Sequence, residues 1–376
     1  MPNLTTADGV FSYLEGTQFA AIDVQLVIGG HSAFTYRATL RTPLPTGESS
    51  IILKHAEGYI AIYEAMKIEA ERAVYEYEAL AAVSKSGLFN SNSTVQAPKP
   101  LHFDPETNTI FMTDLGAVKT LTKVLTDSLE GVYDGDDAES KLKTACDLAS
   151  SAGSALGDFV GRFHNWSSLP EQAALRKRFA QNVAATKQVL SVHHDMAVRA
   201  ATEFGTMEPW LTDIIEAERQ DATSFQDGLA IGDLWLDNVL VSQAPEHGGL
   251  RLYVIDWEMA RPAPPEFDVG EITGAATSFA RRYGVREVYP FVPALHRAYS
   301  RHRTLDPLKI ARLAGIDTMG FGTVLTWARD HTEEFLKQVT QEGQELLRLS
   351  RDGDVSTIRT KSLVKDLFTS ESQQVV

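Results

Sequence analysis

Apolar and polar residues alternate over short stretches in the first 115 residues, which is the pattern of half-buried β-strands. Two stretches there, residues 6–14 and 62–83, instead have the period of an amphipathic helix. The helical pattern dominates from residue 120 onward. We therefore expect an α+β protein whose N-terminal lobe is an antiparallel sheet with one long helix, followed by a larger, mainly helical C-terminal lobe. The predicted strands are residues 24–28, 34–38, 50–55, 100–103 and 109–112.

One long helix and several shorter ones are expected in the C-terminal lobe. Small residues within 138–164 would let neighbouring helices approach the long helix closely. The chain beyond residue 351 is polar apart from a short amphipathic patch at 363–368. The other helices predicted from periodicity are residues 176–190, 209–223, 269–284, 289–301, 307–313 and 322–349.

Two short apolar runs, residues 239–241 and 252–255, interrupt the helical pattern and predict a β-hairpin. Asp233 and Asn238 precede the first run, and Asp256 ends the second. Phosphoryl transfer needs an acid to orient the acceptor hydroxyl, and an amide and a carboxylate to hold magnesium. The spacing of Asp233 and Asn238 suits a kinase catalytic loop, although such residues in a turn more often cap loop hydrogen bonds. The strand end at Asp256 makes a kinase site the better interpretation.

Two features of the first lobe suit the phosphates of a nucleotide. Gly29 and Gly30 lie between two predicted strands, where the backbone can approach phosphate oxygens, although a plain hairpin turn is the commoner role. Lys54 ends a buried strand. A lysine there usually extends to solvent, but in a nucleotide fold it binds the phosphates and needs a glutamate from a helix. We favour Glu76 as that glutamate, with Glu71 as the alternative.

Charge and cysteine content exclude several classes of protein. A formal charge of −15 opposes binding to nucleic acid or anionic lipid. Cys146 is the only cysteine, which excludes an internal disulfide and a thiolate metal cluster. No apolar run approaches the roughly 18 residues of a membrane span, and the first residues do not resemble a signal peptide. We expect a cytoplasmic protein that binds neither nucleic acid nor membrane, and a monomer, with a dimer as the alternative.

Three motifs carry a resemblance to a known superfamily: Gly-Asp-x-x-x-x-Asn at 232–238, Ile-Asp-Trp-Glu at 255–258 and Pro-Pro-Glu-Phe-Asp-Val-Gly at 264–270. With the lysine strand and glutamate helix before them, they resemble the aminoglycoside phosphotransferase and choline kinase superfamily, which has the bilobal protein-kinase-like fold. The Asp-x-Glu motif is similar to that of the methylthioribose kinase-like branch, and further stretches resemble fungal 4-hydroxytryptamine kinases. The resemblance extends from residue 9 to about residue 349.

The resemblance implies ATP and Mg²⁺ as cofactors and assigns a role to each motif residue. Asp233 would orient the acceptor hydroxyl, Asn238 and Asp256 would bind the metal, and Glu258 would assist. Residues 113–116 would be the hinge whose backbone reads adenine. The implied nucleotide-binding residues are Gly29, Gly30, Ser32, Lys54, Glu76, Asp114 and Leu115.

The hinge gives the expected division of the chain. We predict a nucleotide-binding lobe at residues 1–115, a catalytic and acceptor-binding lobe at 116–350 and a polar tail at 351–376. Two departures from the superfamily pattern are present. Ile231 occupies the position where a histidine is usual, and Trp257 with Glu258 replaces the Phe-Gly of protein kinases. Because no Ala-Pro-Glu follows, we do not expect regulation by an activation loop.

Acceptor specificity is expected in the helices after Asp256. Trp235, Trp257 and Trp327 are candidates to frame an aromatic or amine-bearing acceptor, and Asp237 to pair with its ammonium group, with Glu266 and Asp330 as substitutes. Each of these side chains, taken singly, is more often ordinary core or surface.

The favoured function is therefore an ATP-dependent kinase that phosphorylates a hydroxyl of a small secondary metabolite. The best guess for the acceptor is a hydroxytryptamine-like aromatic amine. Alternatives are a kinase for methylthioribose or another sugar or amino alcohol, and a nucleotide-binding pseudokinase.

Overall fold

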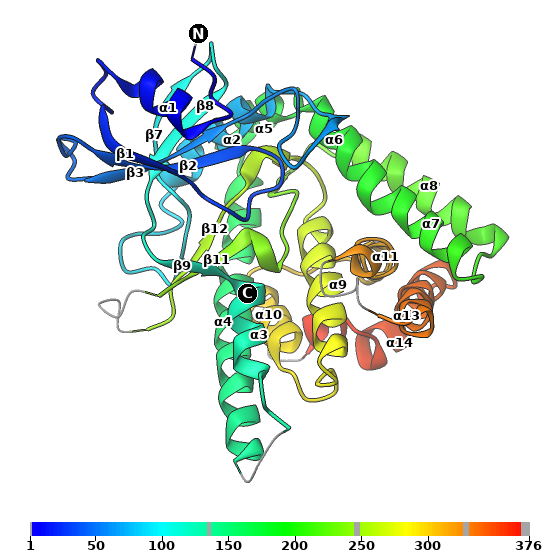
Figure 1. Cartoon of the computed structure of the whole chain (residues 1–376). Coiled ribbons are helices and arrows are strands. Elements are labelled where there is room, and N and C mark those ends of the chain that lie inside the picture. The colour runs from blue at the N-terminus through cyan, green and yellow to red at the C-terminus, as the bar shows by residue number, and fades with distance from the viewer. Residues whose placement is uncertain (1, 134–136, 244–248, 326–330, 370–376) are drawn as a thin grey trace.

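The computed structural model describes residues 2–133, 137–243, 249–325 and 331–369. The first lobe is built on a five-stranded sheet in the order β1-β2-β3-β8-β7, with every neighbouring pair antiparallel (Figure 1). These are the five strands that the alternation in the sequence predicts. Their bounds are Ala21–Leu26 (β1), Phe34–Leu40 (β2), Ser50–His55 (β3), Pro100–Asp104 (β7) and Thr109–Thr113 (β8).

Each face of this sheet packs against a helix. On one face, Tyr36 and Leu53 are buried with Val10 and Leu14 of α1 (Ala7–Leu14), whose first turn is capped by the Thr6 side chain. On the other, Leu80 and Val83 of α2 (Arg72–Lys85) join the core that continues into the second lobe.

The helix predicted over residues 62–83 is wrong in its first part. Tyr59–Ile60 (β4) and Tyr63–Lys67 (β5) form a hairpin there, and α2 begins only at Arg72. The buried Arg72 guanidinium donates to the backbone carbonyls of Glu57 and Glu69, at 2.8 and 2.9 Å. These hydrogen bonds hold the chain before α2 in a non-helical path. Their contribution outweighs the local preference for a helix that the periodicity indicates.

A second sheet joins the lobes in the order β6-β12-β11-β9. The predicted hairpin is confirmed, with Val239 opposite Val254 in the antiparallel pair β11 and β12. Strands β6 and β9, which come from the part of the chain before residue 121, flank this hairpin. In Figure 1 the hairpin lies below the first sheet. The bounds are Val95–Gln96 (β6), Val118–Thr120 (β9), Val239–Ser242 (β11) and Leu252–Val254 (β12). The lobe and tail boundaries given by the sequence stay predictions.

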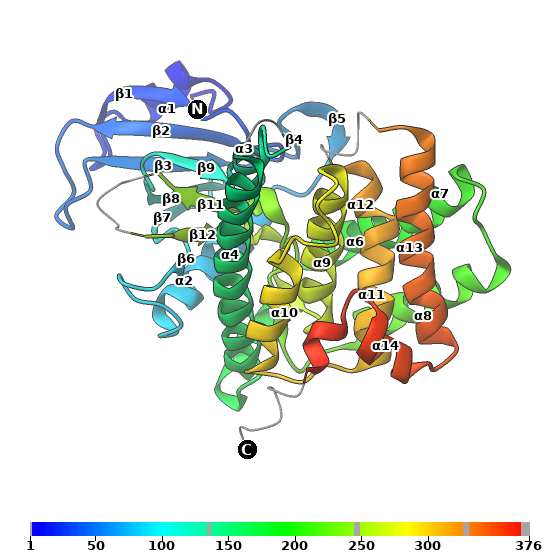
Figure 2. The same ribbon diagram turned by 90° about the horizontal axis from the view of Figure 1, so that it is seen from below.

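The long helix α4 (Ala138–Ser167) is confirmed, and α10 (Phe291–Ser300) lies along it (Figure 2). Glycines allow this close approach, since a Cβ on Gly157 would lie 2.1 Å from the Leu295 carbonyl oxygen. The other helices are α3 (Leu121–Leu129), α5 (Ala173–Phe179), α6 (Val183–Leu190), α7 (Met196–Glu203), α8 (Pro209–Ser224), α9 (Glu266–Arg282), α11 (Pro307–Met319), α12 (Phe321–Val324), α13 (Glu333–Arg351) and α14 (Val355–Lys361).

Two predicted helices are divided in the structure. The stretch 176–190 breaks before α6, because the Asn182 side chain caps Ala185 and donates to the Glu258 and Ala260 carbonyls. The stretch 322–349 contains α12 and α13, and Thr332 caps α13. After α13, Ile358 and Leu367 are buried against the second lobe. None of the helices in the described residues is both long and apolar enough to cross a membrane.

Candidate active site

A cavity of about 640 Å³ lies between the two lobes. It is lined by the glycine turn, β3, the segment after β8, the loop before β11, the end of β12 and α12. Of the predicted site residues that the structure describes, all line it except Trp257 and Glu266, and Trp327 and Asp330 lie outside the described residues. The chain therefore brings together groups separated by more than 200 positions in the sequence.

Lys54 is the centre of an ion-pair network at one end of this cavity. Its Nζ lies 2.7 Å from Glu76 Oε2, is hydrogen-bonded to Asp256 and is 3.9 Å from Glu258 Oε2. Glu76, rather than Glu71, is thus the helix glutamate beside Lys54. Burial lowers the pKa of Lys54, but the charges of Asp256, Glu76 and Glu258 outweigh burial and raise that pKa above its ordinary value. Lys54 is held as a cation in the place expected of a phosphate-binding lysine.

Arg72 belongs to the same network, although sequence reasoning missed it. Its Nε lies 3.2 Å from Glu258 Oε2, and its Nη2 donates to the Ser32 carbonyl oxygen at 2.7 Å. One buried side chain therefore fixes both the metal-motif glutamate and the glycine turn. Nothing in the helical periodicity distinguishes Arg72 from the solvent-exposed charges around it.

Asp233 and Asn238 face one another in the loop before β11. The Asn238 side-chain amide donates to Asp233 Oδ2 at 2.7 Å and to the Asp233 carbonyl at 2.9 Å. Burial, followed by the charge of Asp256, raises the pKa of Asp233 to about 7, while His193 and the Asn238 hydrogen bond oppose the rise. The preceding residue must be glycine, because Gly232 has φ of +92° and a Cβ there would lie 2.2 Å from the Met259 carbonyl oxygen.

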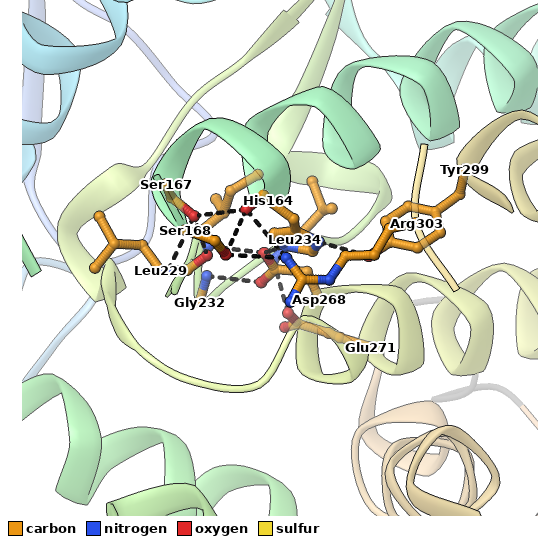
Figure 3. A network of polar contacts seen from close by, with 11 residues as sticks. His164, Ser167, Ser168, Leu229, Gly232, Leu234, Asp268, Glu271, Tyr299 and Arg303 are labelled. Carbon is orange, nitrogen blue, oxygen red and sulfur yellow. Dashed lines mark hydrogen bonds and ion pairs between the residues drawn. The ribbon is translucent and has the colours of Figure 1, made fainter. Parts of the chain in front are cut away.

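Two buried carboxylates of α9 hold the backbone of this loop from behind (Figure 3). Asp268 accepts from the Ile231 and Gly232 amides at 2.8 and 3.0 Å, and Glu271 accepts from the Leu234 amide at 2.7 Å. The sequence pattern in which Asp268 stands was noticed only as a resemblance. Its role, and that of Glu271, follow from packing that the sequence does not show.

His164, in the last turn of α4, fixes Asp268 through hydrogen bonds of its ring. Its Nε2 lies 3.0 Å from Asp268 Oδ2, and its Nδ1 lies 2.9 Å from the Tyr299 hydroxyl (Figure 3). Asp268 is therefore fixed in place by α4 as well as by its own helix. Ile231, fully buried, takes part in loop support through its backbone amide.

The donor set near Asp256 fits a nucleotide-bound Mg²⁺ rather than a metal site made by the protein alone. The described residues contain no group of three or more His, Cys, Asp or Glu side chains that could hold a metal ion by themselves. Asn238 donates its amide hydrogens to Asp233, so its side-chain oxygen is the atom that would face a metal, and Asn238 and Asp256 line the same cavity. Mg²⁺ commonly takes one or two protein oxygens and completes its shell with phosphates and water.

The segment after β8 lines the cavity as expected of a hinge, but the Asp114 side chain is already used. Its carboxylate accepts from Arg37 Nε and Ser50 Oγ, both at 2.8 Å, and from the Gly116 amide at 2.9 Å. Only the backbone around Asp114 and Leu115 remains for a nucleotide base. The carboxylate thus links β2, β3 and the backbone of the segment after β8.

Away from the Lys54 network, the cavity is lined by aromatic and polar side chains, one further acid and the two lysines Lys119 and Lys123. The rings of Trp235 and Phe321 make an edge contact with centroids 5.4 Å apart. Met259, Gln188 and Asp237 complete this end. In the described part of the chain, the Asp237 carboxylate and the Gln188 amide make no side-chain hydrogen bond or ion pair. Phe321 and Gln188 were missed because only the fold brings α12 and α6 to this cavity.

Two predicted acceptor residues are wrong. Trp257 is 1% exposed, donates from Nε1 to the Val254 carbonyl at 3.0 Å and packs against Phe163, so it belongs to the core. Glu266, a substitute for pairing with ammonium, is buried and accepts from the Asp306 amide at 3.1 Å. The other substitute, Asp330, lies outside the described residues.

Comparisons with known proteins agree with this geometry. The model of the phosphotransferase enzyme family matches residues 24–309. A 4-hydroxytryptamine kinase of Psilocybe cyanescens is 28% identical over 371 residues, which cover 96% of this chain and 98% of that protein. Its namesake in Psilocybe cubensis is 30% identical over 283 residues, 72% of this chain and 73% of that protein.

A choline/ethanolamine kinase family protein from Mesorhizobium loti superposes with a TM-score of 0.44 and 17% identity, over 97% of this chain and 92% of that one. The family match, by contrast, extends through both lobes and includes Lys54, Asp233, Asn238 and Asp256. The chain belongs to the phosphotransferase enzyme family and is a small-molecule phosphotransferase.

Proposed function

We propose that this protein transfers the γ-phosphate of ATP to the hydroxyl group of a hydroxytryptamine-like aromatic amine. The observation that carries the proposal is the composition of one cavity. Lys54, Asp256 and Asp233 line the same cavity as the contacting rings of Trp235 and Phe321 and the Asp237 carboxylate. The relatives named as 4-hydroxytryptamine kinases support the same acceptor class.

At the nucleotide end, the protein supplies charge and backbone. Lys54 would hold phosphate oxygens, and Glu76 would keep its ammonium group in place. The turn at Gly29 and Gly30 would cover the phosphates, with Arg72 fixing the end of that turn at Ser32. When bound by Asn238 and Asp256, Mg²⁺ neutralises charge on the phosphates. Glu258, held by Arg72, would support this metal side from behind.

Asp233 would orient the acceptor hydroxyl. Its carboxylate lines the cavity between the phosphate-binding lysine and the acceptor end, and Asn238 fixes its direction. Because phosphoryl transfer depends mainly on positioning and charge, a rigid acid at this point is the main catalytic requirement on the acceptor side.

The acceptor end suits a flat ring that carries a cation. Trp235 and Phe321 offer aromatic surface for an indole, and Asp237 offers a negative charge for its ammonium group. The net charge of −15 favours cationic ligands at long range. We therefore assign ring recognition to Trp235 and Phe321 and amine recognition to Asp237.

A second candidate is a kinase for methylthioribose or another sugar or amino alcohol. The free amide of Gln188 favours it, since an amide beside a carboxylate also suits several hydroxyl groups. A pseudokinase is not supported, because the lysine, acids and amide of phosphoryl transfer all line one cavity.

Coupled ADP release with magnesium and ATP tests the proposal across hydroxytryptamines, methylthioribose, choline, ethanolamine and aminoglycosides. Turnover of the hydroxytryptamines, lost in Asp233→Asn, is the expected result. Turnover of a sugar or amino alcohol alone would replace the acceptor but keep the mechanism. Full activity of Asp233→Asn would contradict the mechanism itself.

A further inference from the structure

His193 lies close to the acids that support the catalytic loop, although α7 and α8 separate it from that loop in the sequence. It is part of a π-helical turn, Ser191–Asp195, between α6 and α7, and its side chain is 3% exposed. Such wide turns are rare and occur often at functional sites. The turn is tightly packed, since a Cβ on Gly320 would lie 2.7 Å from the His193 carbonyl oxygen. The backbone of this turn is therefore packed directly against the end of α11.

The two ring nitrogens of His193 face two buried acids. Nδ1 is hydrogen-bonded to Asp317 of α11, and Nε2 lies 3.7 Å from Glu271 Oε1 of α9. The other oxygen of Glu271 accepts from the Leu234 amide, next to Asp233. A continuous line of contacts thus runs from α11 through His193 and Glu271 to the loop that carries the catalytic acid.

Glu271 needs a group that keeps it in position. It is fully buried, and burial, with the nearby charges of Asp233, Asp317 and Asp268, raises its pKa well above the ordinary value. An acid in such surroundings is displaced easily unless a hydrogen-bonding or cationic partner faces it. Among the described residues, the Arg261 guanidinium is buried nearby but makes no hydrogen bond from its Nη atoms. His193 is the ring that approaches Glu271 Oε1 directly.

We propose that His193 is a positioning residue of the phosphoryl transfer: its imidazole bridges Asp317 and Glu271, holds the Glu271 carboxylate on the Leu234 amide, and thereby fixes Asp233. Its catalytic consequence rests on the proposed kinase function. The same ring lies 5.4 Å from the Phe321 ring, which lines the acceptor end of the cavity. His193 therefore contacts both the support of the catalytic loop and the wall of the acceptor site.

The structure supplies an internal control on the same loop. The Ile231 and Gly232 amides are held by Asp268. Asp268 is hydrogen-bonded to His164 of α4, which is in turn hydrogen-bonded to Tyr299 of α10. His193 takes no part in these contacts. Loss of His193 should release the Leu234 amide without releasing the amides of Ile231 and Gly232.

Amide hydrogen exchange on the full chain measures this directly and needs no acceptor. In His193→Leu, exchange at Leu234 is expected to accelerate about tenfold or more, with Ile231 and Gly232 unchanged. His193→Gln keeps a nitrogen near the place of Nε2 and should restore slow exchange. His193→Asn keeps only the Nδ1 side and should not.

Kinetics give the second readout. With the acceptor found by the ADP-release panel, kcat of His193→Leu should fall about 10- to 100-fold with an unchanged KM for ATP. His194→Leu is the matched control. His194 lies in the same π-helical turn, is fully buried, and in the described part of the chain its ring nitrogens have no hydrogen-bond partner. It should leave both exchange at Leu234 and kcat near wild type.

The outcomes separate this inference from the proposed function. Wild-type exchange at Leu234 in His193→Leu would overturn it, as would equal acceleration at Ile231 and Gly232. Equal loss of kcat in His194→Leu would also overturn it, because packing alone would then explain the effect. If the wild-type protein phosphorylated none of the acceptors, the proposed acceptor would fail, while the exchange result would still decide the role of His193.

Discussion

The two ends of the cavity use charge in opposite ways. At the nucleotide end, Lys54 and Arg72 are paired with Glu76, Asp256 and Glu258, all within the protein. At the acceptor end, Asp237 and Gln188 have no side-chain partner in the described residues and stand beside aromatic rings. In the proposed function, the reaction would therefore depend on groups that hold one another in place, whereas acceptor choice would depend on a few groups without side-chain partners.

Lys54→Met tests the paired end and should have the largest effect. It leaves Glu76, Asp256 and Glu258 close together with less positive charge, and removing one partner of a buried pair costs about 3–5 kcal/mol. ATP binding by calorimetry should be lost, and the melting temperature should fall. Lys143→Met, which removes an exposed partner of Asp147 and lies outside the cavity lining, is the control and should change neither. Retained ATP affinity in Lys54→Met would remove the distinction between the two ends.

Arg72→Met should weaken ATP binding about 10- to 100-fold, because it frees both Glu258 and the glycine turn at Ser32. The KM values for ATP and for the acceptor measure which end responds. Arg178, half-exposed and paired with Glu78, provides the control arginine. A change confined to the acceptor KM would show that the network does not belong to the nucleotide end.

The contrast also explains how far the sequence could lead. The sheet strands and the hairpin with Asp233, Asn238 and Asp256 were predictable, because alternation and strand ends are local features. The β4 and β5 hairpin was not, since its path depends on carbonyl bonds to Arg72.

Within the site, too, local features could be predicted and features that depend on tertiary packing could not. The pairing of Lys54 with a helix glutamate could be expected from the order of strand and helix. Phe321, Gln188 and His193 could not, because packing between helices brings them to the cavity or behind its loop. Trp257 was misassigned because the sequence does not show whether a tryptophan beside a metal motif points into the cavity or into the core.

Asp237→Asn tests the free end and should have a moderate effect. It removes the charge proposed to pair with the acceptor amine, so KM for a cationic hydroxytryptamine should rise about three- to tenfold, with kcat and the ATP KM unchanged. A neutral hydroxyindole without the amine is the matched substrate, and its KM should not respond. Equal effects on both substrates would mean that Asp237 does not recognise the ammonium group.

The smallest effect is expected for Trp257→Phe, which tests whether the Trp257 side chain contacts the acceptor. The substitution removes the hydrogen bond to the Val254 carbonyl in the core and should cost about 1 kcal/mol of stability. Since Trp257 is 1% exposed and its ring packs on Phe163, the acceptor KM should not change. Trp235→Phe, at the ring that does line the cavity, should raise that KM measurably. Thermal unfolding and acceptor titration of the two variants therefore separate core from wall, and a raised KM in Trp257→Phe would place the acceptor deeper than this cavity extends.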